Sequence, residues 1–76
     1  MNMNAIETVA VTFRADKRGD FKGTVTACFA DGSCYGHVGQ HSTYSADWYA
    51  TTRPTTFAEY SPLMRELERG GYTLRV

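Results

Sequence analysis

Four side chains that could bind a metal ion or act in catalysis lie close together in the sequence. They are Cys28, Cys34, His37 and His41. Cysteine sulfur and histidine nitrogen are ligands that zinc takes, but this spacing matches no common zinc finger. The first interpretation is therefore one core cysteine, one surface cysteine and two hydrogen-bonding histidines, with no cofactor. A zinc site at these four residues is the alternative.

The Asp-Gly pair at 31–32 predicts a two-residue β-hairpin turn in the middle of this stretch. With that pair at the tip, Phe29 lies opposite Cys34 and Cys28 lies opposite Tyr35. The two cysteines then point to different faces, which argues against a shared zinc ion and against a disulfide. A three-residue loop would instead place the two cysteines on the same face. The predicted core face carries Val25, Ala27, Phe29, Cys34, Gly36 and Val38, and the predicted outer face carries Thr26, Cys28, Tyr35 and His37.

The same stretch could also supply a nucleophile and its base. Cys28 would be the nucleophile, His37 the base and Asp47 the group that orients the base. No established catalytic motif surrounds these residues, and 76 residues leave little material for a cleft. We therefore predict that the protein is not an enzyme.

Alternating apolar and polar residues predict the strands that must position these side chains. The first strand covers residues 7–14, with its valines and Phe13 on one face. The second strand covers residues 21–29 and the third covers residues 33–38. Two successive antiparallel hairpins follow from this pattern.

A long amphipathic helix is predicted after Thr56, because Thr56 and Glu59 have the spacing of a capping box. Gly70-Gly71 provides a stop. Pro62 lies beyond the first turn, so we expect a kink or a loosened turn there, or a helix that restarts with Ser61 as its cap. The apolar stripe consists of Phe57, Tyr60, Leu63, Met64 and Leu67.

The remaining segments complete a small α+β domain. Residues 40–54 lack a clear period, although Ser45 could cap one or two helical turns, with Trp48 or Tyr49 packing back onto the domain. Residues 72–76 alternate as a last short strand with Val76 inward. We predict one domain over residues 1–76, frayed over residues 1–5. Its fold is two-layer: a four-stranded, mainly antiparallel sheet in the order β-β-β-α-β, with one amphipathic helix on one face.

The charge balance argues against two functional classes. Eight basic and eight acidic residues cancel, which disfavours an acidic DNA mimic and a strongly basic nucleic-acid binder. Nucleic-acid binding stays open as an alternative, because a basic cluster lies at the first hairpin and an exposed tyrosine can stack on bases. This cluster consists of Arg14, Lys17, Arg18 and Lys22.

The first residues carry no basic segment followed by an apolar run. We therefore expect neither a signal peptide nor a membrane segment, and a cytoplasmic protein with reduced cysteines.

Five short stretches of the chain match a pattern found in other proteins: Tyr35-Gly36-His37-Val38-Gly39-Gln40-His41, Thr52-Arg53-Pro54, Glu59-Tyr60, Leu67-Glu68 and Gly71-Tyr72. Through these stretches the chain resembles a group of short uncharacterised proteins from phages, prophages and other bacterial mobile elements. The resemblance covers residues 9–76, and H-V-G-Q-H is its most specific part. It implies no established activity and no catalytic or binding residue. Proteins of this size and origin often bind a host protein, as anti-CRISPR proteins do.

The prediction is a small non-enzymatic module that binds a host protein or protein complex, and the resemblance implies a mobile-element inhibitor of a host defence system. A homodimer through an edge strand is also open. The outer face of the sheet would be the binding surface unless residues 42–54 fold over it. The expected binding residues are Tyr35, His37, Gln40, His41, Trp48 and Tyr49.

Overall fold

The structure, a computed structural model, describes residues 8–17, 23–36 and 40–76. The predicted α+β class is confirmed, but the sheet has more strands than predicted and a second, short helix is present. The strands are β1 (Val9–Asp16), β2 (Val25–Phe29), β3 (Ser33–Gly36), β4 (Gln40–Thr43), β5 (Thr52–Pro54) and β6 (Leu74–Arg75), and the helices are α1 (Ala46–Ala50) and α2 (Phe57–Arg69).

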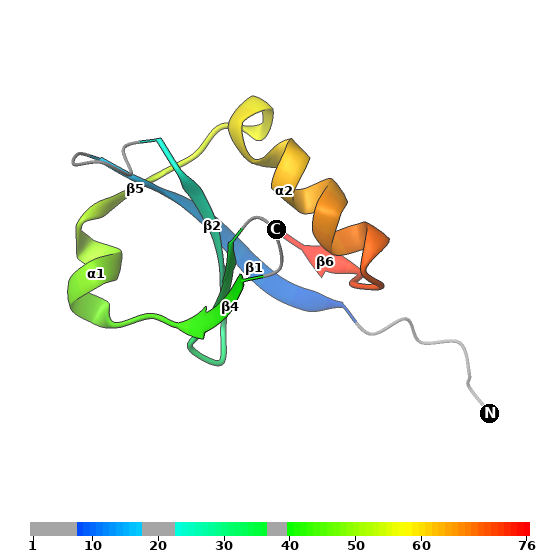
Figure 1. Cartoon of the computed structure of the whole chain (residues 1–76), viewed down its shortest axis with the longest axis horizontal. Helices are drawn as coiled ribbons and strands as arrows, with labels where there is room; N and C mark the ends of the chain where they lie inside the picture. The colour runs from blue at the N-terminus through cyan, green and yellow to red at the C-terminus, as the bar shows by residue number, and fades with distance from the viewer. Residues whose placement is uncertain (1–7, 18–22, 37–39) are drawn as a thin grey trace.

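The sheet is built on β1, its longest strand, which has partners on both sides (Figure 1). The strand order is β4-β3-β2-β1-β5, and all these pairs are antiparallel. β5 pairs with Arg14–Asp16 of β1, whereas β6 pairs in parallel with Val9 and Ala10. β1 therefore holds β2 along one side and the two short strands along the other.

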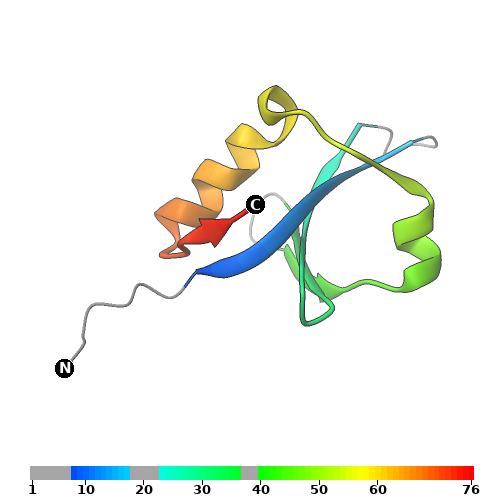
Figure 2. The same ribbon diagram turned by 180° about the vertical axis from the view of Figure 1, so that it is seen from behind.

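The two helices lie on opposite faces of the sheet (Figures 1 and 2). β4 and β5 stand at opposite ends of the strand order, so the chain between them has to cross the sheet. This connection, residues 44–51, carries α1 and covers the face that α2 leaves open. The predicted sheet with one amphipathic helix on one face is therefore present, and the short α1 is an addition on the opposite face.

The hydrophobic core lies between the sheet and α2. Phe13 stacks on Tyr60 of α2 with ring centroids 4.5 Å apart, and Phe29 stacks on Tyr72 at 5.8 Å. Val76, predicted to point inward, is instead 63% exposed because it follows the end of β6. The buried core residues are Val11, Phe13, Val25, Ala27, Phe29, Leu63 and Leu67.

The tip of the β2–β3 hairpin differs from the predicted turn. Ala30, Asp31 and Gly32 lie between the strands as a three-residue loop. Gly32 has φ +91° and its N–H donates to the carbonyl of Phe29 at 3.1 Å, which fits a turn followed by a left-handed residue. The Asp31 carboxylate accepts from the N–H of Ser33 at 2.9 Å and supports this shape.

The additional loop residue shifts the pairing by one position. Cys28 lies opposite Cys34, and Ala27 lies opposite Tyr35. A shift of one residue moves every side chain of the strand to the other face. The predicted core positions of Cys34 and Gly36 and the predicted outer position of Tyr35 are therefore wrong, and Val38 and His37 lie outside the described residues.

Helix α2 has the ends that its sequence predicts. The Thr56 hydroxyl accepts from the N–H of Glu59, and Glu59 accepts from the N–H of Thr56, which completes the capping box. At the other end, Gly71 has φ +106° and the N–H of Tyr72 donates to the carbonyl of Leu67. The helix runs through an exposed Pro62, so the alternative of a restart after Ser61 is wrong.

An ion pair joins the start of α2 to β5 and makes the fold sensitive to acid. Nη1 and Nη2 of Arg53 donate to the two carboxylate oxygens of Glu59 at 3.0 and 2.7 Å. These bonds, together with the bond from the Thr56 N–H, lower the pKa of Glu59 to about 2. Stability from the ionised carboxylate is therefore complete above about pH 4.5 and is lost as the pH falls toward 2.

We expect Glu59→Gln to remove part of this acid dependence. The measurement is the urea midpoint of unfolding as a function of pH, from neutral down to about 2. Glu68→Gln, at an exposed position of the same helix, is the matched control and should keep the slope of the parent protein. An equally steep loss in Glu59→Gln would contradict the assignment.

Candidate functional site

Three aromatic residues form the covering layer over the outer face of the sheet: Tyr44, Trp48 and Tyr49. Ser45 caps α1 by accepting from the N–H of Trp48 at 3.1 Å, so the predicted cap is confirmed. The ring of Tyr44 lies 6.0 Å from that of Trp48 and 5.8 Å from that of Tyr49. The Tyr44 hydroxyl donates to the carbonyl of Phe29 at 2.9 Å, which fastens the layer to β2.

Arg14 connects the sheet to this layer. Its Nε donates to Oγ1 of Thr52 at 2.8 Å, and its Nη2 donates to the carbonyl of the same residue at 2.9 Å. The guanidinium carbon lies 4.5 Å from the centre of the Tyr49 ring. The prediction that Trp48 or Tyr49 packs back onto the domain is confirmed at Tyr49.

The bonds from Arg14 to Thr52 remove this residue from the basic cluster that was expected to bind nucleic acid. Arg14 is bound within the protein, whereas Lys17 is exposed. Arg18 and Lys22 lie outside the described residues. In the part of the chain that the structure describes, one exposed lysine at this hairpin does not form a basic surface.

An open pocket of about 320 Å³ lies between the sheet and the β4–α1 segment. Cys34 lines it, with its Sγ 3.1 Å from Oγ of Ser42. Four of the nine lining residues carry a small hydroxyl-bearing side chain, and one carries an indole. The lining residues are Asp16, Thr24, Thr26, Cys34, Gly36, Ser42, Thr43, Tyr44 and Trp48.

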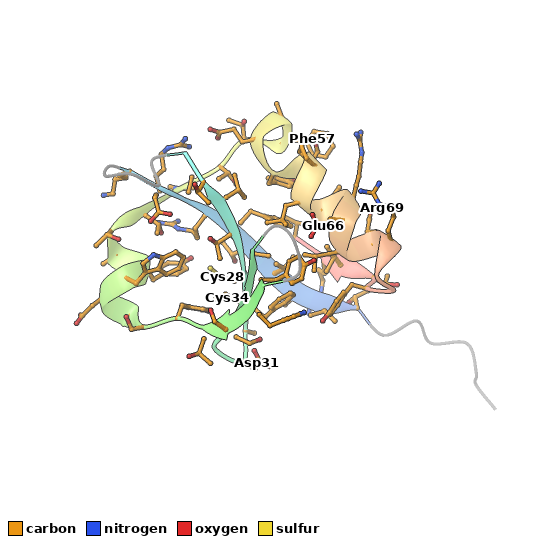
Figure 3. All side chains as sticks on the ribbon, viewed as in Figure 1. Cys28, Asp31, Cys34, Phe57, Glu66 and Arg69 are labelled. Carbon is orange, nitrogen blue, oxygen red and sulfur yellow. The ribbon has the colours of Figure 1, made fainter. Side chains whose placement is uncertain are left out.

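The two cysteines lie side by side on this outer face, contrary to the prediction that they point to different faces (Figure 3). Both are buried free thiols. Burial, and next the neighbouring Cys34, raise the pKa of Cys28 to about 11, so Cys28 is a protonated thiol at neutral pH. A thiol in this state is a poor nucleophile, which weakens the alternative of Cys28 as a catalytic residue.

The proposed partners of Cys28 do not gather around it in the described residues. Asp47 is exposed in the first turn of α1, and His37 lies outside the described residues. His41 pairs with Tyr35, one position from the Cys34–Ser42 pair, so its side chain lies on the opposite face from the cysteines. Across residues 8–17, 23–36 and 40–76, no three His, Cys, Asp or Glu side chains converge as a metal site.

Tyr35 and His41 lie on the face that packs against α2. Their rings meet edge to face with centroids 4.7 Å apart. The Tyr35 hydroxyl donates to the carboxylate of Glu66 in α2. Gln40 contributes its backbone to β4, and its side chain is outside the description. The predicted binding residues are therefore divided between two faces: Tyr35 and His41 on one, Trp48 and Tyr49 on the other.

β4 stands between these two groups and was not predicted as a strand. Its residues Ser42 and Thr43 are exposed polar residues at one end of the sheet. A second open pocket, of about 450 Å³, lies on the α2 side and is lined by His41 together with Phe29 and Tyr72. β4 is recognised as an edge strand only from its pairing with β3, because its sequence Gln-His-Ser-Thr does not alternate between apolar and polar residues.

Comparison of the chain with protein-family models, with curated proteins and with solved structures gave no match. Among the described residues, no helix combines the length and apolar character needed to cross a bilayer. The functional argument therefore rests on the geometry of the chain itself.

We expect Arg14→Lys to destabilise the protein by about 1–2 kcal/mol, although the charge is retained. Lysine cannot reproduce the two bonds to Thr52, which is 3% exposed, or the planar stack on Tyr49. Urea unfolding measures the loss. Lys17→Arg, the exposed matched control, should leave the midpoint unchanged, and an unchanged midpoint in Arg14→Lys would contradict the structural role.

Proposed function

We propose that the protein is a small non-enzymatic binding module that pairs an extended segment of a partner protein with the outer edge of β4. The observation that carries the proposal is the direction of the β4 backbone. Addition of a strand to an exposed sheet edge is an established mode of peptide recognition, in which main-chain hydrogen bonds supply the affinity.

The direction follows from one hydrogen bond. The N–H of Tyr44 donates to the carbonyl of Gly32, beside β3, at 3.1 Å. Backbone polar groups of successive residues in an antiparallel strand point alternately to its two sides. Ser42 therefore directs its N–H and C=O toward β3, whereas His41 and Thr43 direct theirs toward the outer edge.

Among the outer strands, β4 is the one best suited to accept another strand. β5 ends in Pro54, which has no N–H to donate, and β6 has only two residues. β4 has four residues and contains neither proline nor a charged side chain. Within the described part of the chain, the sheet ends at this strand.

The open pockets on the two faces of the sheet also favour an added strand as the ligand. Side chains of a strand added beside β4 would alternate between the α1 face and the α2 face. The α1 face offers the pocket with Ser42 and Trp48, and the α2 face offers the pocket with His41 and Tyr72. This edge would therefore select an extended peptide whose side chains enter both pockets.

The resemblance to mobile-element proteins supports a bacterial host protein or protein complex as the partner. Inhibition of a host defence system, as by anti-CRISPR proteins, is the biological outcome that this part of the proposal implies. Binding at β4 does not depend on that outcome, so the two parts of the proposal are tested separately.

The test compares Thr43→Pro with Thr43→Ala. Proline removes the outward N–H of residue 43 without removing a bond to β3, whereas alanine keeps that N–H and is the matched control. Both variants should keep the thermal midpoint of the parent protein. Tagged versions are then used to capture proteins from a lysate of the bacterial host.

We expect Thr43→Ala to retain the partner protein and Thr43→Pro to lose it. In the purified complex, hydrogen exchange at the amides of His41 and Thr43 should slow. Retention of the partner by a folded Thr43→Pro variant would refute binding at β4. Conversion of a dimer to a monomer by Thr43→Pro would show that a second copy of the chain, not a different protein, occupies the edge.

A further inference from the structure

Cys28 and Cys34 are neighbouring free thiols on the outer face of the sheet. Cys28 lies in β2 directly opposite Cys34 in β3, and the two are 3% and 8% exposed. Figure 3 labels both near the middle of the sheet. Cys34 lines the pocket on the α1 side of the proposed binding edge, but neither sulfur atom takes part in the main-chain bonds proposed for β4.

The backbone brings the two residues as close as paired strands allow. The N–H of Asp16 donates to the carbonyl of Thr24 at 3.2 Å, so by alternation Cys28 directs its backbone groups toward β1. Cys34 lies opposite Ser42, which faces β3, so Cys34 directs its own groups toward β4. The two cysteines are consequently a non-hydrogen-bonded pair, with Cα atoms about 4.5 Å apart.

This spacing falls within the range that a disulfide spans, which is about 4.4–6.8 Å between Cα atoms. It lies at the short end of that range. The side chains share one face, so no backbone movement is needed to turn one sulfur toward the other.

The pocket beneath α1 distinguishes the two sulfur atoms. Cys34 lines the pocket, and its Sγ contacts the Ser42 hydroxyl. Cys28 lines a different open pocket, of about 250 Å³, and burial raises its pKa to about 11, which makes its sulfur the less reactive toward an oxidant. A small oxidant therefore reacts with Cys34 first.

We propose that Cys28 and Cys34 are a reversible redox pair that forms a cross-strand disulfide when a hydroperoxide oxidises Cys34. The sulfur of Cys34 takes the terminal oxygen of hydrogen peroxide, which gives a sulfenic acid and one water. Cys28 is a poor nucleophile toward solutes, but it lies directly opposite the sulfenic acid. Its sulfur attacks the Cys34 sulfur as its proton passes to the hydroxyl group, which leaves as a second water. Two thiols lose two electrons, and the peroxide accepts them.

Oxidation changes the wall of the pocket. The Cys34 sulfur turns from Ser42 toward Cys28, so the side-chain contact between β3 and β4 is lost while a covalent bond joins β2 to β3. A thiol such as glutathione reverses the reaction by exchange. The inference concerns a modification site and holds whatever partner binds at β4.

The test uses the folded parent protein and hydrogen peroxide. After treatment, free thiols are alkylated in denaturant and the chain is cleaved before aspartate. Cleavage before Asp31 separates the fragment with Cys28 from the fragment with Cys34, so a disulfide appears as two joined peptides. We expect the joined product in the parent protein, and its separation by dithiothreitol.

Two variants test the order of the steps. In Cys28→Ser, dimedone should trap a sulfenic acid on Cys34, whereas in Cys34→Ser the remaining thiol should stay alkylatable at the same peroxide dose. The proposal is overturned if both thiols of the folded parent protein stay alkylatable, or if oxidation yields only sulfinic acids or cross-links between chains. The decisive result comes from the parent protein, so it does not depend on the folding of a variant.

Discussion

The three-residue loop at the tip of the β2–β3 hairpin decides what each face of the sheet presents. One residue more than a two-residue turn places Cys34 beside Cys28 and directs Tyr35 toward α2. β4 continues the pattern through its own pairing with β3, which sets His41 against Tyr35 and Ser42 against Cys34. The proposed binding edge and the position of the thiol pair both follow from this register.

The two faces use different physical interactions. The α2 face is an apolar core whose helix is held by its capping box and by the Arg53–Glu59 ion pair. The α1 face is polar: Arg14 donates to buried Thr52, aromatic rings cover the strands, and small hydroxyl groups line an open pocket. Successive side chains of β4 point alternately to the two faces of the sheet. A partner bound at β4 would therefore contact both faces.

The elements with strong local signals were predictable from the sequence. β1 and β2 show their alternation, and α2 shows its apolar stripe, its cap at Thr56 and its stop at Gly71. β4 and β5 were not predictable because they are short and polar, and the partner of β5 is distant in the chain. The face assignment of Cys34 and Tyr35 failed because Asp31-Gly32 fits both a two-residue turn and a three-residue loop. The carboxylate bond from Asp31 to Ser33 favours the loop that forms.

The register of β2 against β3 is tested most directly by nuclear Overhauser contacts between backbone Hα atoms in the reduced protein. Hα atoms of a non-hydrogen-bonded antiparallel pair approach each other closely, so a strong contact identifies the residues that lie opposite. The structure predicts this contact between Cys28 and Cys34, together with contacts from the Tyr35 ring to α2. Direct pairing of Cys28 with Tyr35 instead would contradict the register, and with it the arrangement of both faces.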